Sequence, residues 1–323
     1  MEGYTPLPAH AFEPAGLTTG PQTTGPQTTG PQTTGPQTTG PQTTGPQTTG
    51  PQTTGPQTTG PQMTGPQMTC RHPLTLVALH GFTQTGASWG PLATRLGGSY
   101  RLLAPDAPGH GRASALRAGL WETADLLDGT VVADGGSVAG WVGYSMGGRM
   151  ALHVALAHPR AVPKLALIST SPGIEDDIER EARHAADEAL AKRIEEGGPQ
   201  GLGRFLADWL AQPLFATLPR ERAGLDARLS NSPAGLASSL RLAGAGAQEP
   251  LWGRLPELGR RKLPVLLLAG ELDRKYCELA SATAEAIGPT ATVRIVSGAG
   301  HACHLERPDE VAGELARFFD AGD

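Results

Sequence analysis

The sequence predicts an α/β fold in which a mostly parallel sheet is flanked by helices and carries an inserted helical lid. Short apolar runs alternate with helical stretches from Pro73 onward, as in consecutive strand, helix and strand units. The strand pattern stops between residues 171 and 255, where a charged, alanine-rich stretch replaces it. The motif GYSMG at Gly143–Gly147 joins an apolar run to a helix.

Six strands are expected, and none of them precedes Leu74, so an antiparallel edge pair should be absent or shortened. The last helix places Val311, Leu315 and Phe318 on one apolar stripe. The expected strands are 74–79, 100–104, 138–142, 164–169, 265–269 and 292–296, and the expected helices are 89–96, 146–157, 278–287 and 308–319.

The stretch 171–255 is too long to be a plain loop in a compact domain. We expect a helical lid inserted after the strand that ends near Ser169. Its large apolar side chains could cover a pocket above the sheet, although packing within the lid is the simpler use of them. They are Phe205, Trp209, Leu210, Leu214 and Phe215.

Residues 1–69 are expected to be disordered. Ten tandem five-residue units, TTGPQ or MTGPQ, run from Thr18 to Gln67. Their composition lacks the apolar side chains that offset the entropy of ordering a chain. Two interpretations stay open: a flexible extension of the native protein, or a translated upstream repeat with the functional start at Met63 or Met68.

Residues 70–323 suffice for one α/β domain that carries the insertion. The formal net charge of −5 argues against nucleic acid as a partner. No apolar run is long enough for a membrane helix and no signal-peptide pattern is present, so we expect a cytoplasmic protein without a membrane partner. Three cysteines are too few for a disulfide framework, and the oligomeric state is not fixed.

A serine, an acid and a histidine form a candidate catalytic triad. GYSMG places Ser145 on a sharp turn from strand to helix, with its hydroxyl lifted out of the sheet. Asp273 follows the expected strand 265–269 and His301 follows the expected strand 292–296, both at the carboxyl end of the strand, where catalytic groups gather. The chain order Ser, Asp, His is that of the α/β-hydrolase fold. His301 would accept the Ser145 proton while Asp273 orients the imidazole.

Several neighbours compete for these roles. Asp273 could instead cap the following helix, which would leave Glu271 as the acid. His304 lies three residues beyond His301, and the HACH sequence they form lacks further ligands nearby, so no metal site is predicted. His80 more simply holds the turn after its strand through a local hydrogen bond.

The reacting oxyanion would bind two backbone amides. The strand 74–79 runs into a turn at Gly81, which brings the amide of Phe82 toward the pocket. The amide of Met146 begins the helix after Ser145, and a helix N-terminus favours negative charge. We expect these two amides to form the oxyanion hole.

Arg149 distinguishes the possible reaction classes. It stands one helical turn after Ser145, on a helix otherwise made of small and apolar residues. A buried guanidinium is costly without a counter-charge, which a substrate carboxylate or an acid of the lid could supply. Tyr144 could pack against the site or donate a hydrogen bond to a substrate.

Six segments together resemble one family of the α/β-hydrolase fold, the 2-succinyl-6-hydroxy-2,4-cyclohexadiene-1-carboxylate synthase (MenH) family of menaquinone biosynthesis. The resemblance covers most of residues 74–320. The segments are HGFTQTGASW at 80–89, DAPGHG at 106–111, GYSMGGRMAL at 143–152, STSPGI at 169–174, GELDRKY at 270–276 and GAGHACHLERP at 298–308.

The resemblance implies a lyase that needs no cofactor. Such an enzyme eliminates pyruvate from 2-succinyl-5-enolpyruvyl-6-hydroxy-3-cyclohexene-1-carboxylate by proton abstraction with the Ser-His-Asp set. The resemblance also implies that lid arginines meet the substrate carboxylates, with Arg183 and, less directly, Arg180 as candidates. Two other functions stay open: a serine hydrolase, either a carboxylesterase or a carbon–carbon bond hydrolase, and a binding protein that kept the fold.

Overall fold

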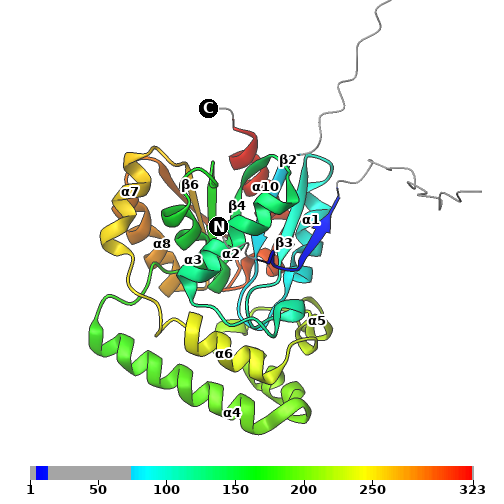
Figure 1. Cartoon of the computed structure of the whole chain (residues 1–323). Coiled ribbons are helices and arrows are strands. Elements are labelled where there is room, and N and C mark those ends of the chain that lie inside the picture. The colour runs from blue at the N-terminus through cyan, green and yellow to red at the C-terminus, as the bar shows by residue number, and fades with distance from the viewer. Residues whose placement is uncertain (1–4, 14–73, 322–323) are drawn as a thin grey trace, which may run out of the picture. The chain divides into compact units, whose positions relative to one another are not determined.

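Seven strands form one sheet in the part of the chain that the structure, a computed structural model, describes, which is residues 5–13 and 74–321. The strand order is β1-β3-β2-β4-β5-β6-β7 (Figure 1). All neighbouring strands are parallel except β1 and β3. The strands are β1 (Ala9–Phe12), β2 (Leu74–Leu79), β3 (Tyr100–Pro105), β4 (Val138–Tyr144), β5 (Leu165–Ile168), β6 (Val265–Gly270) and β7 (Ala291–Val296). The predicted fold class and its six strands are confirmed.

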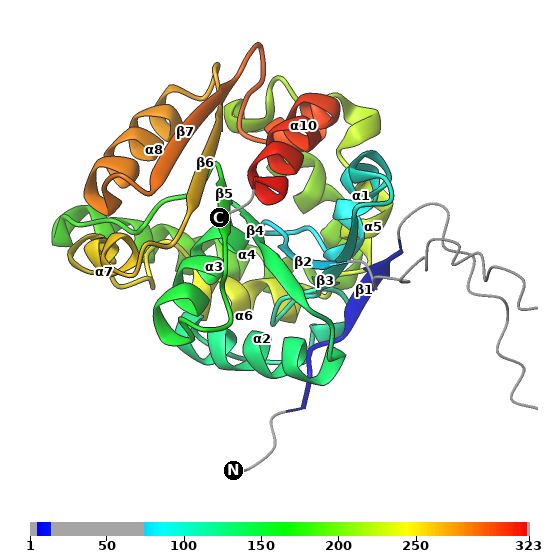
Figure 2. The same cartoon turned by 90° about the horizontal axis from the view of Figure 1, so that it is seen from above.

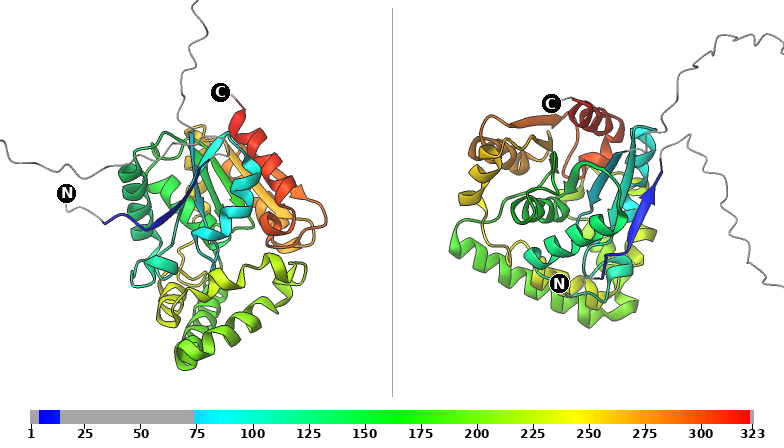
Figure 3. Two further views of the ribbon diagram at one scale, coloured as in Figure 1. Left: turned by 90° about the vertical axis from the view of Figure 1, so that its right-hand side faces the viewer. Right: turned by 45° about the horizontal axis from the view of Figure 1, so that its top comes forward.

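The expectation that no strand precedes Leu74 is wrong. β1 pairs antiparallel with β3, from Ala9 opposite Pro105 to Phe12 opposite Leu102, and lies along the outer edge of the sheet (Figure 3). Four residues are too few to show an alternating pattern, and β1 depends on a partner that is distant in sequence. The predicted disorder of residues 1–69 is therefore wrong for Ala9–Phe12, while the repeat lies outside the described residues.

Helices cover both faces of the sheet (Figure 2). Val77 and Leu79 of β2 pack in the layer that holds α2, α3, α7 and α8, whereas Leu76 and Ala78 pack in the layer of α1 and α10. Strands buried on both faces appear in the sequence as continuous apolar runs. The helices are α1 (Gly90–Leu96), α2 (Leu120–Asp134), α3 (Met146–Ala157), α7 (Leu255–Arg260), α8 (Arg274–Ile287) and α10 (Pro308–Asp320), with short connecting helices η1 (Gly86–Trp89), η2 (Gly111–Ala113), η5 (Trp252–Arg254) and α9 (Cys303–Glu306).

Two details of these helices differ from the expectations. α2 was not expected, because Gly129 and the β-branched residues that follow it give a weak helical signal. In α10, Phe319 joins Val311 and Leu315 on the buried face, whereas Phe318 is only partly buried.

The chain between β5 and β6 is mostly helical. Its elements are α4 (Asp177–Leu210), η3 (Pro213–Phe215), η4 (Arg220–Arg222), α5 (Leu225–Leu229) and α6 (Pro233–Ala243). α4 bends at Gly198, whose φ of 57° is left-handed, and packs on α6 through a small apolar cluster that includes Leu206 and Leu236. Among the helices of residues 74–321, none combines the length and apolar character that a membrane crossing requires.

Candidate active site

Ser145 occupies a strained turn between β4 and α3. Its φ of 52° and ψ of −110° lie where non-glycine residues are rarely found. The two glycines of the motif permit the turn by their lack of a side chain. A Cβ at Gly143 would lie 2.4 Å from the carbonyl oxygen of Gly147, and a Cβ at Gly147 would lie 2.1 Å from that of Leu79. The motif therefore fixes close backbone packing that presents Ser145 to a cavity.

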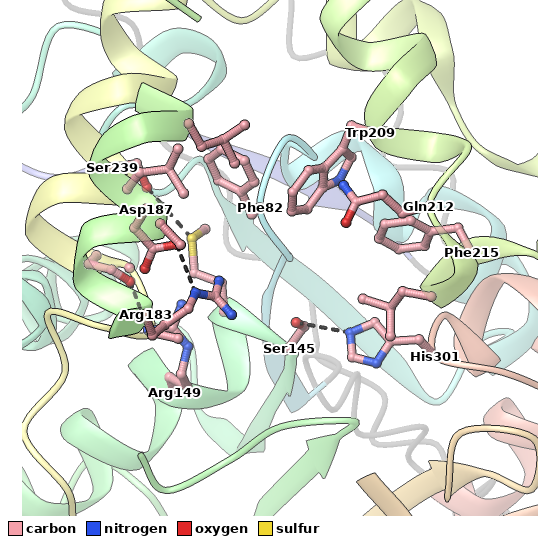
Figure 4. Close-up of a pocket in the computed structure, with 18 of the residues that line it drawn as sticks. Phe82, Ser145, Arg149, Arg183, Asp187, Trp209, Gln212, Phe215, Ser239 and His301 are labelled. Atoms are coloured by element: carbon pink, nitrogen blue, oxygen red, sulfur yellow. Dashed lines mark hydrogen bonds and ion pairs between the residues drawn. The ribbon is translucent and has the colours of Figure 1, made fainter. Parts of the chain in front are cut away.

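His301 lies between Ser145 and Asp273. Its Nδ1 is 2.7 Å from Asp273 Oδ2, and its Nε2 is 3.2 Å from Ser145 Oγ (Figure 4). A carboxylate only accepts hydrogen bonds, so Nδ1 carries the ring proton and Nε2 can accept the Ser145 hydroxyl proton. The structure thus brings together the three side chains of the candidate triad.

The competing acid, Glu271, is directed elsewhere. Its carboxylate accepts hydrogen bonds from Ser297 Oγ and from the Gly298 amide, on the surface. Asp273 does stand at the start of α8, but its side chain caps no backbone amide of that helix. The carboxylate of Asp273 is therefore directed to His301.

His304 and His80 are buried outside the cavity lining. The His304 ring packs between Trp89 and Tyr144, at centroid distances of 5.2 and 4.2 Å, and neither of its nitrogens has a hydrogen-bond partner among the described residues. His80 Nε2 accepts a backbone amide at 3.0 Å, so its Nδ1 carries the proton and donates to Gly81 O at 2.9 Å. Burial lowers the pKa of His80 to about 4 and that of His304 to about 3, so both rings are neutral near pH 7.

Phe82 and Met146, the two expected oxyanion donors, border the same cavity as Ser145. Phe82 follows β2 and Met146 opens α3. Within the described part of the chain, neither backbone amide donates a hydrogen bond. Both amides remain candidates for binding an oxyanion, with the positive end of the α3 dipole close by.

A cavity of about 440 Å³ opens over Ser145, between the sheet and the lid. Figure 4 shows Arg149 and Arg183 on one side of Ser145 and His301 on the other. The charged side chains of its lining are four arginines and one carboxylate: Arg149, Arg183, Arg193, Arg228 and Asp187. This excess of positive charge favours an anionic ligand.

Arg149 is partly buried and donates only to neutral oxygens. Its Nη1 donates to Ala243 O at 2.8 Å and contacts Gln248 Oε1 at 3.4 Å, and no ion pair of Arg149 occurs among the described residues. Burial lowers the pKa of Arg149 to about 10, which still leaves it charged near neutral pH. The alternative of a salt bridge to a lid acid is therefore not realised, because Asp187, the carboxylate of the cavity lining, pairs with Arg183 instead.

The two lid arginines are placed differently. Arg183 lines the cavity and its Nε is 2.9 Å from Asp187 Oδ1, one turn further along α4. Arg180 lies one turn nearer the start of α4, where it pairs with Asp177 and donates to Ile174 O at 3.2 Å. Arg180 does not line the cavity, because at that turn the helix has already passed its edge. The expectation for Arg180 as a substrate contact is thus not met by the geometry.

Arg228 and Tyr276 are among the cavity residues that the sequence analysis did not identify. Arg228 of α5 is 2% exposed, donates to Thr83 Oγ1 and to Ala223 O, and burial lowers its pKa to about 10. Tyr276 lines the cavity, and its ring centroid lies 4.5 Å from that of His301. No motif surrounds Arg228 in the sequence. Tyr276 ends the GELDRKY segment. Its position three residues after Asp273 is the only feature of the sequence that could have indicated a place near the active site.

The apolar lid residues divide between the cavity and the lid core. Trp209, Leu214 and Phe215 line the cavity, whereas Phe205 and Leu210 pack elsewhere. Tyr144 also lines the cavity while its ring packs against His304. These aromatic and aliphatic surfaces form the apolar part of a small-molecule site.

The fold and the candidate triad define an enzyme of the α/β-hydrolase class, and the profile of the alpha/beta hydrolase family matches residues 76–314. A 2-succinyl-6-hydroxy-2,4-cyclohexadiene-1-carboxylate synthase of Serratia proteamaculans is 34% identical over 76% of this chain and 92% of its own length. The synthase of Salmonella paratyphi C is 32% identical over 76% and 93%. The chain belongs to this synthase (MenH) family, as its motifs indicated.

Solved structures agree with this assignment. The structure of MenH from S. aureus has a TM-score of 0.70 and 33% identity, covering 76% of this chain and 93% of that one. An esterase from Thermogutta terrifontis has a TM-score of 0.63 and 23% identity, covering 76% and 89%. The second likeness concerns the fold alone.

Proposed function

We propose that the protein eliminates pyruvate from 2-succinyl-5-enolpyruvyl-6-hydroxy-3-cyclohexene-1-carboxylate to give 2-succinyl-6-hydroxy-2,4-cyclohexadiene-1-carboxylate, a step of menaquinone biosynthesis. The observation that carries the proposal is Arg149, a partly buried charge that has no carboxylate partner among the described residues and lies one turn from Ser145. An ester of neutral groups would leave this charge uncompensated, whereas a substrate carboxylate satisfies it. Family membership supports the same substrate.

The names of substrate and product define the bond changes. One ring double bond, at C3, becomes two, at C2 and C4. A base removes the proton from C2, which lies next to the succinyl carbonyl, and the C–H electron pair forms the C2–C3 double bond. The former C3–C4 double bond moves to C4–C5, and the bond from C5 to the enolpyruvyl oxygen breaks. The departing enol takes up a proton and rearranges to pyruvate, so no water is consumed.

The triad supplies the base in this proposal. His301 Nε2 accepts the Ser145 proton, which makes the serine oxygen basic toward the C2 proton. Asp273 holds the ring through Nδ1 and balances the imidazolium charge. Negative charge that develops on the succinyl carbonyl oxygen is stabilised by the amides of Phe82 and Met146.

The arginines orient the substrate. Arg228 offers a buried charge and Arg149 a partly buried one, and Arg183 offers a half-exposed charge from the lid. Guanidinium groups bind carboxylates with two parallel hydrogen bonds, which fix position as well as charge. Binding the carboxylates at separate arginines would hold the substrate in one orientation next to Ser145.

The test compares two reactions of one purified preparation. Pyruvate release from the proposed substrate is measured through lactate dehydrogenase and NADH, and hydrolysis of p-nitrophenyl acetate is measured in parallel, with Ser145→Ala as the blank. We expect pyruvate release with negligible ester turnover. Ester turnover without pyruvate would instead support the alternative, a serine hydrolase that uses the same triad.

A cytoplasmic location is part of this proposal, because the proposed substrate is a soluble polyanion made by preceding enzymes of the same pathway. Immunoblotting of fractionated native cells tests the location. Recovery in the membrane or external fraction would contradict it.

A further inference from the structure

We infer that the segment 7–12, which precedes the repeat, is an integral part of the catalytic domain that positions the oxyanion loop, residues 80–86. On this inference the TTGPQ repeat is an insertion in the sequence between β1 and β2. A chain that starts at Met63 or Met68 would then lack residues 7–12, which the enzyme needs for full activity. Three sets of contacts lead to this conclusion.

The segment is built into the apolar core. Leu7 is 3% exposed within the layer that also holds α2 and α3. Its amide donates to Thr130 Oγ1 of α2 at 2.8 Å. Phe12 lies over Gly90 at the start of α1, where a Cβ would be 3.4 Å from the Phe12 ring. Removing the segment would expose these apolar surfaces and the ladder groups of β3.

The segment 7–12 also contacts Asp106, which in turn anchors the oxyanion loop. The Asp106 amide donates to Pro8 O at 2.8 Å, and His10 Nε2 lies 3.5 Å from Asp106 Oδ1. The same carboxylate oxygen accepts the Gly86 amide at 2.8 Å, at one end of the loop.

The other end of the oxyanion loop, at His80, is hydrogen-bonded to Ala107, the residue that follows Asp106. His80 Nε2 accepts the Ala107 amide at 3.0 Å. Both ends of the oxyanion loop are therefore fixed to Asp106–Ala107, and Asp106 is fixed to β1 and to the residues before it. Phe82, a candidate oxyanion donor, lies between the two ties.

The register of the sheet shows where the insertion occurs. Phe12 lies opposite Leu102, and Leu74 lies opposite Tyr100, on the two sides of β3. The flanking residues are thus two strands and two residues apart, about 12 Å at the usual strand spacing and rise. They lie at the amino ends of the parallel strands, away from the site at the carboxyl ends.

The experiment compares three chains: the full chain, a chain that lacks residues 18–67, and a chain that starts at Met68. After the internal deletion, residues 13–17 and 68–73 still join β1 to β2, and these eleven residues can span roughly 36 Å. We expect this chain to keep the Tm and kcat of the full chain. The chain from Met68 should lose about 5 °C or more in Tm and about tenfold or more in kcat, with KM changed less, because oxyanion donors act mainly in the transition state.

Strand addition provides the positive test. A synthetic peptide of residues 5–13 should raise the Tm and restore kcat of the chain from Met68, by pairing with the exposed edge of β3. If that chain does not remain in solution, Leu7→Asp in the full chain replaces it, with Val132→Asp as the control, since Val132 is 72% exposed on α2. Leu7→Asp should lower Tm and kcat, and Val132→Asp should change neither.

Equal Tm and kinetics for the full chain and the chain from Met68 would overturn the inference. Equal losses on deleting the repeat alone, or equal effects of Leu7→Asp and Val132→Asp, would also overturn it. The Tm and peptide results do not depend on which reaction the enzyme performs. If they hold while no pyruvate is released, the proposed function fails and the inference stands.

Discussion

The candidate triad and the cavity arginines Arg149 and Arg228 differ in how their ionisable groups are paired. In the triad, the acid, the imidazole and the hydroxyl are hydrogen-bonded to one another. The two arginines contact only neutral protein oxygens within the described residues, although burial makes their charges costly. The polar groups of the triad have hydrogen-bond partners without a ligand, whereas the two arginines gain an ion-pair partner only when an anion binds. The triad therefore determines what chemistry is possible, and the arginines determine on which substrate.

The largest expected effect comes from breaking the triad. Ser145→Ala, Asp273→Asn and His301→Ala should each lower kcat for pyruvate release by about 10³-fold or more, because the base is lost or wrongly oriented. Tm should change little for Ser145→Ala and Asp273→Asn, which remove few atoms, and more for His301→Ala, whose buried ring packs against aromatic neighbours such as Tyr276. Steady-state kinetics and thermal melts measure both. Full activity of the His301→Ala variant would refute the assignment.

Removing the charge of Arg149 should have the next largest effect. Arg149→Met keeps most of the side-chain volume but removes the guanidinium that would bind a substrate carboxylate. Losing one partner of a desolvated charge pair costs about 2–5 kcal/mol of binding free energy. We expect kcat/KM for pyruvate release to fall by about 30-fold to 5,000-fold. Arg261→Met is the matched control, because Arg261 is also partly buried and donates to a backbone carbonyl, Ala155 O, outside the cavity. Equal losses in both variants would mean that Arg149 acts through packing alone.

The two lid arginines permit a sharper comparison within one helix. Arg183→Met should raise KM by about threefold to tenfold, a modest effect because this guanidinium is 46% exposed and already paired with Asp187. Arg180→Met should leave KM unchanged, because Arg180 is bonded at the start of α4, outside the cavity. The reverse result would show that the lid closes further over the substrate than in this structure.

The sequence predicts those parts of the site that depend on local pattern. GxSxG encodes a turn whose glycines are demanded by backbone packing, and Asp273 and His301 stand directly after strands recognised by their apolar runs. Arg228 and β1 could not be predicted in this way. Arg228 comes from a short lid helix whose position depends on tertiary packing, and β1 is a strand only because β3 offers an edge. Arg180 was expected in the cavity because spacing alone does not show where along α4 the cavity ends.

The last expected effect concerns stability, not catalysis, and compares a buried neutral ring with the charged arginines of the cavity. Burial lowers the pKa of His304 to about 3, so the folded protein keeps this ring neutral where the unfolded chain, with its ordinary pKa near 6.5, binds a proton. Below pH 6.5 the unfolded state therefore binds more protons, and stability falls as pH decreases. Between the two pKa values, each such group lowers the free energy of unfolding by at most about 1.4 kcal/mol for every unit by which the pH falls.

His304→Phe tests this account, because a phenyl ring can keep the contacts with Trp89 and Tyr144 but cannot titrate. Between pH 7.5 and pH 5.0, the parent should lose about 2 kcal/mol more stability than the variant, equivalent to roughly 4–8 °C in Tm. His184→Phe, at an exposed histidine of α4, is the control and should melt like the parent at both pH values. A parallel shift of parent and His304→Phe with pH would mean that His304 is protonated in the folded state. Its two nitrogens, which lack partners in the described residues, would then need an acceptor that only a rearranged core could supply.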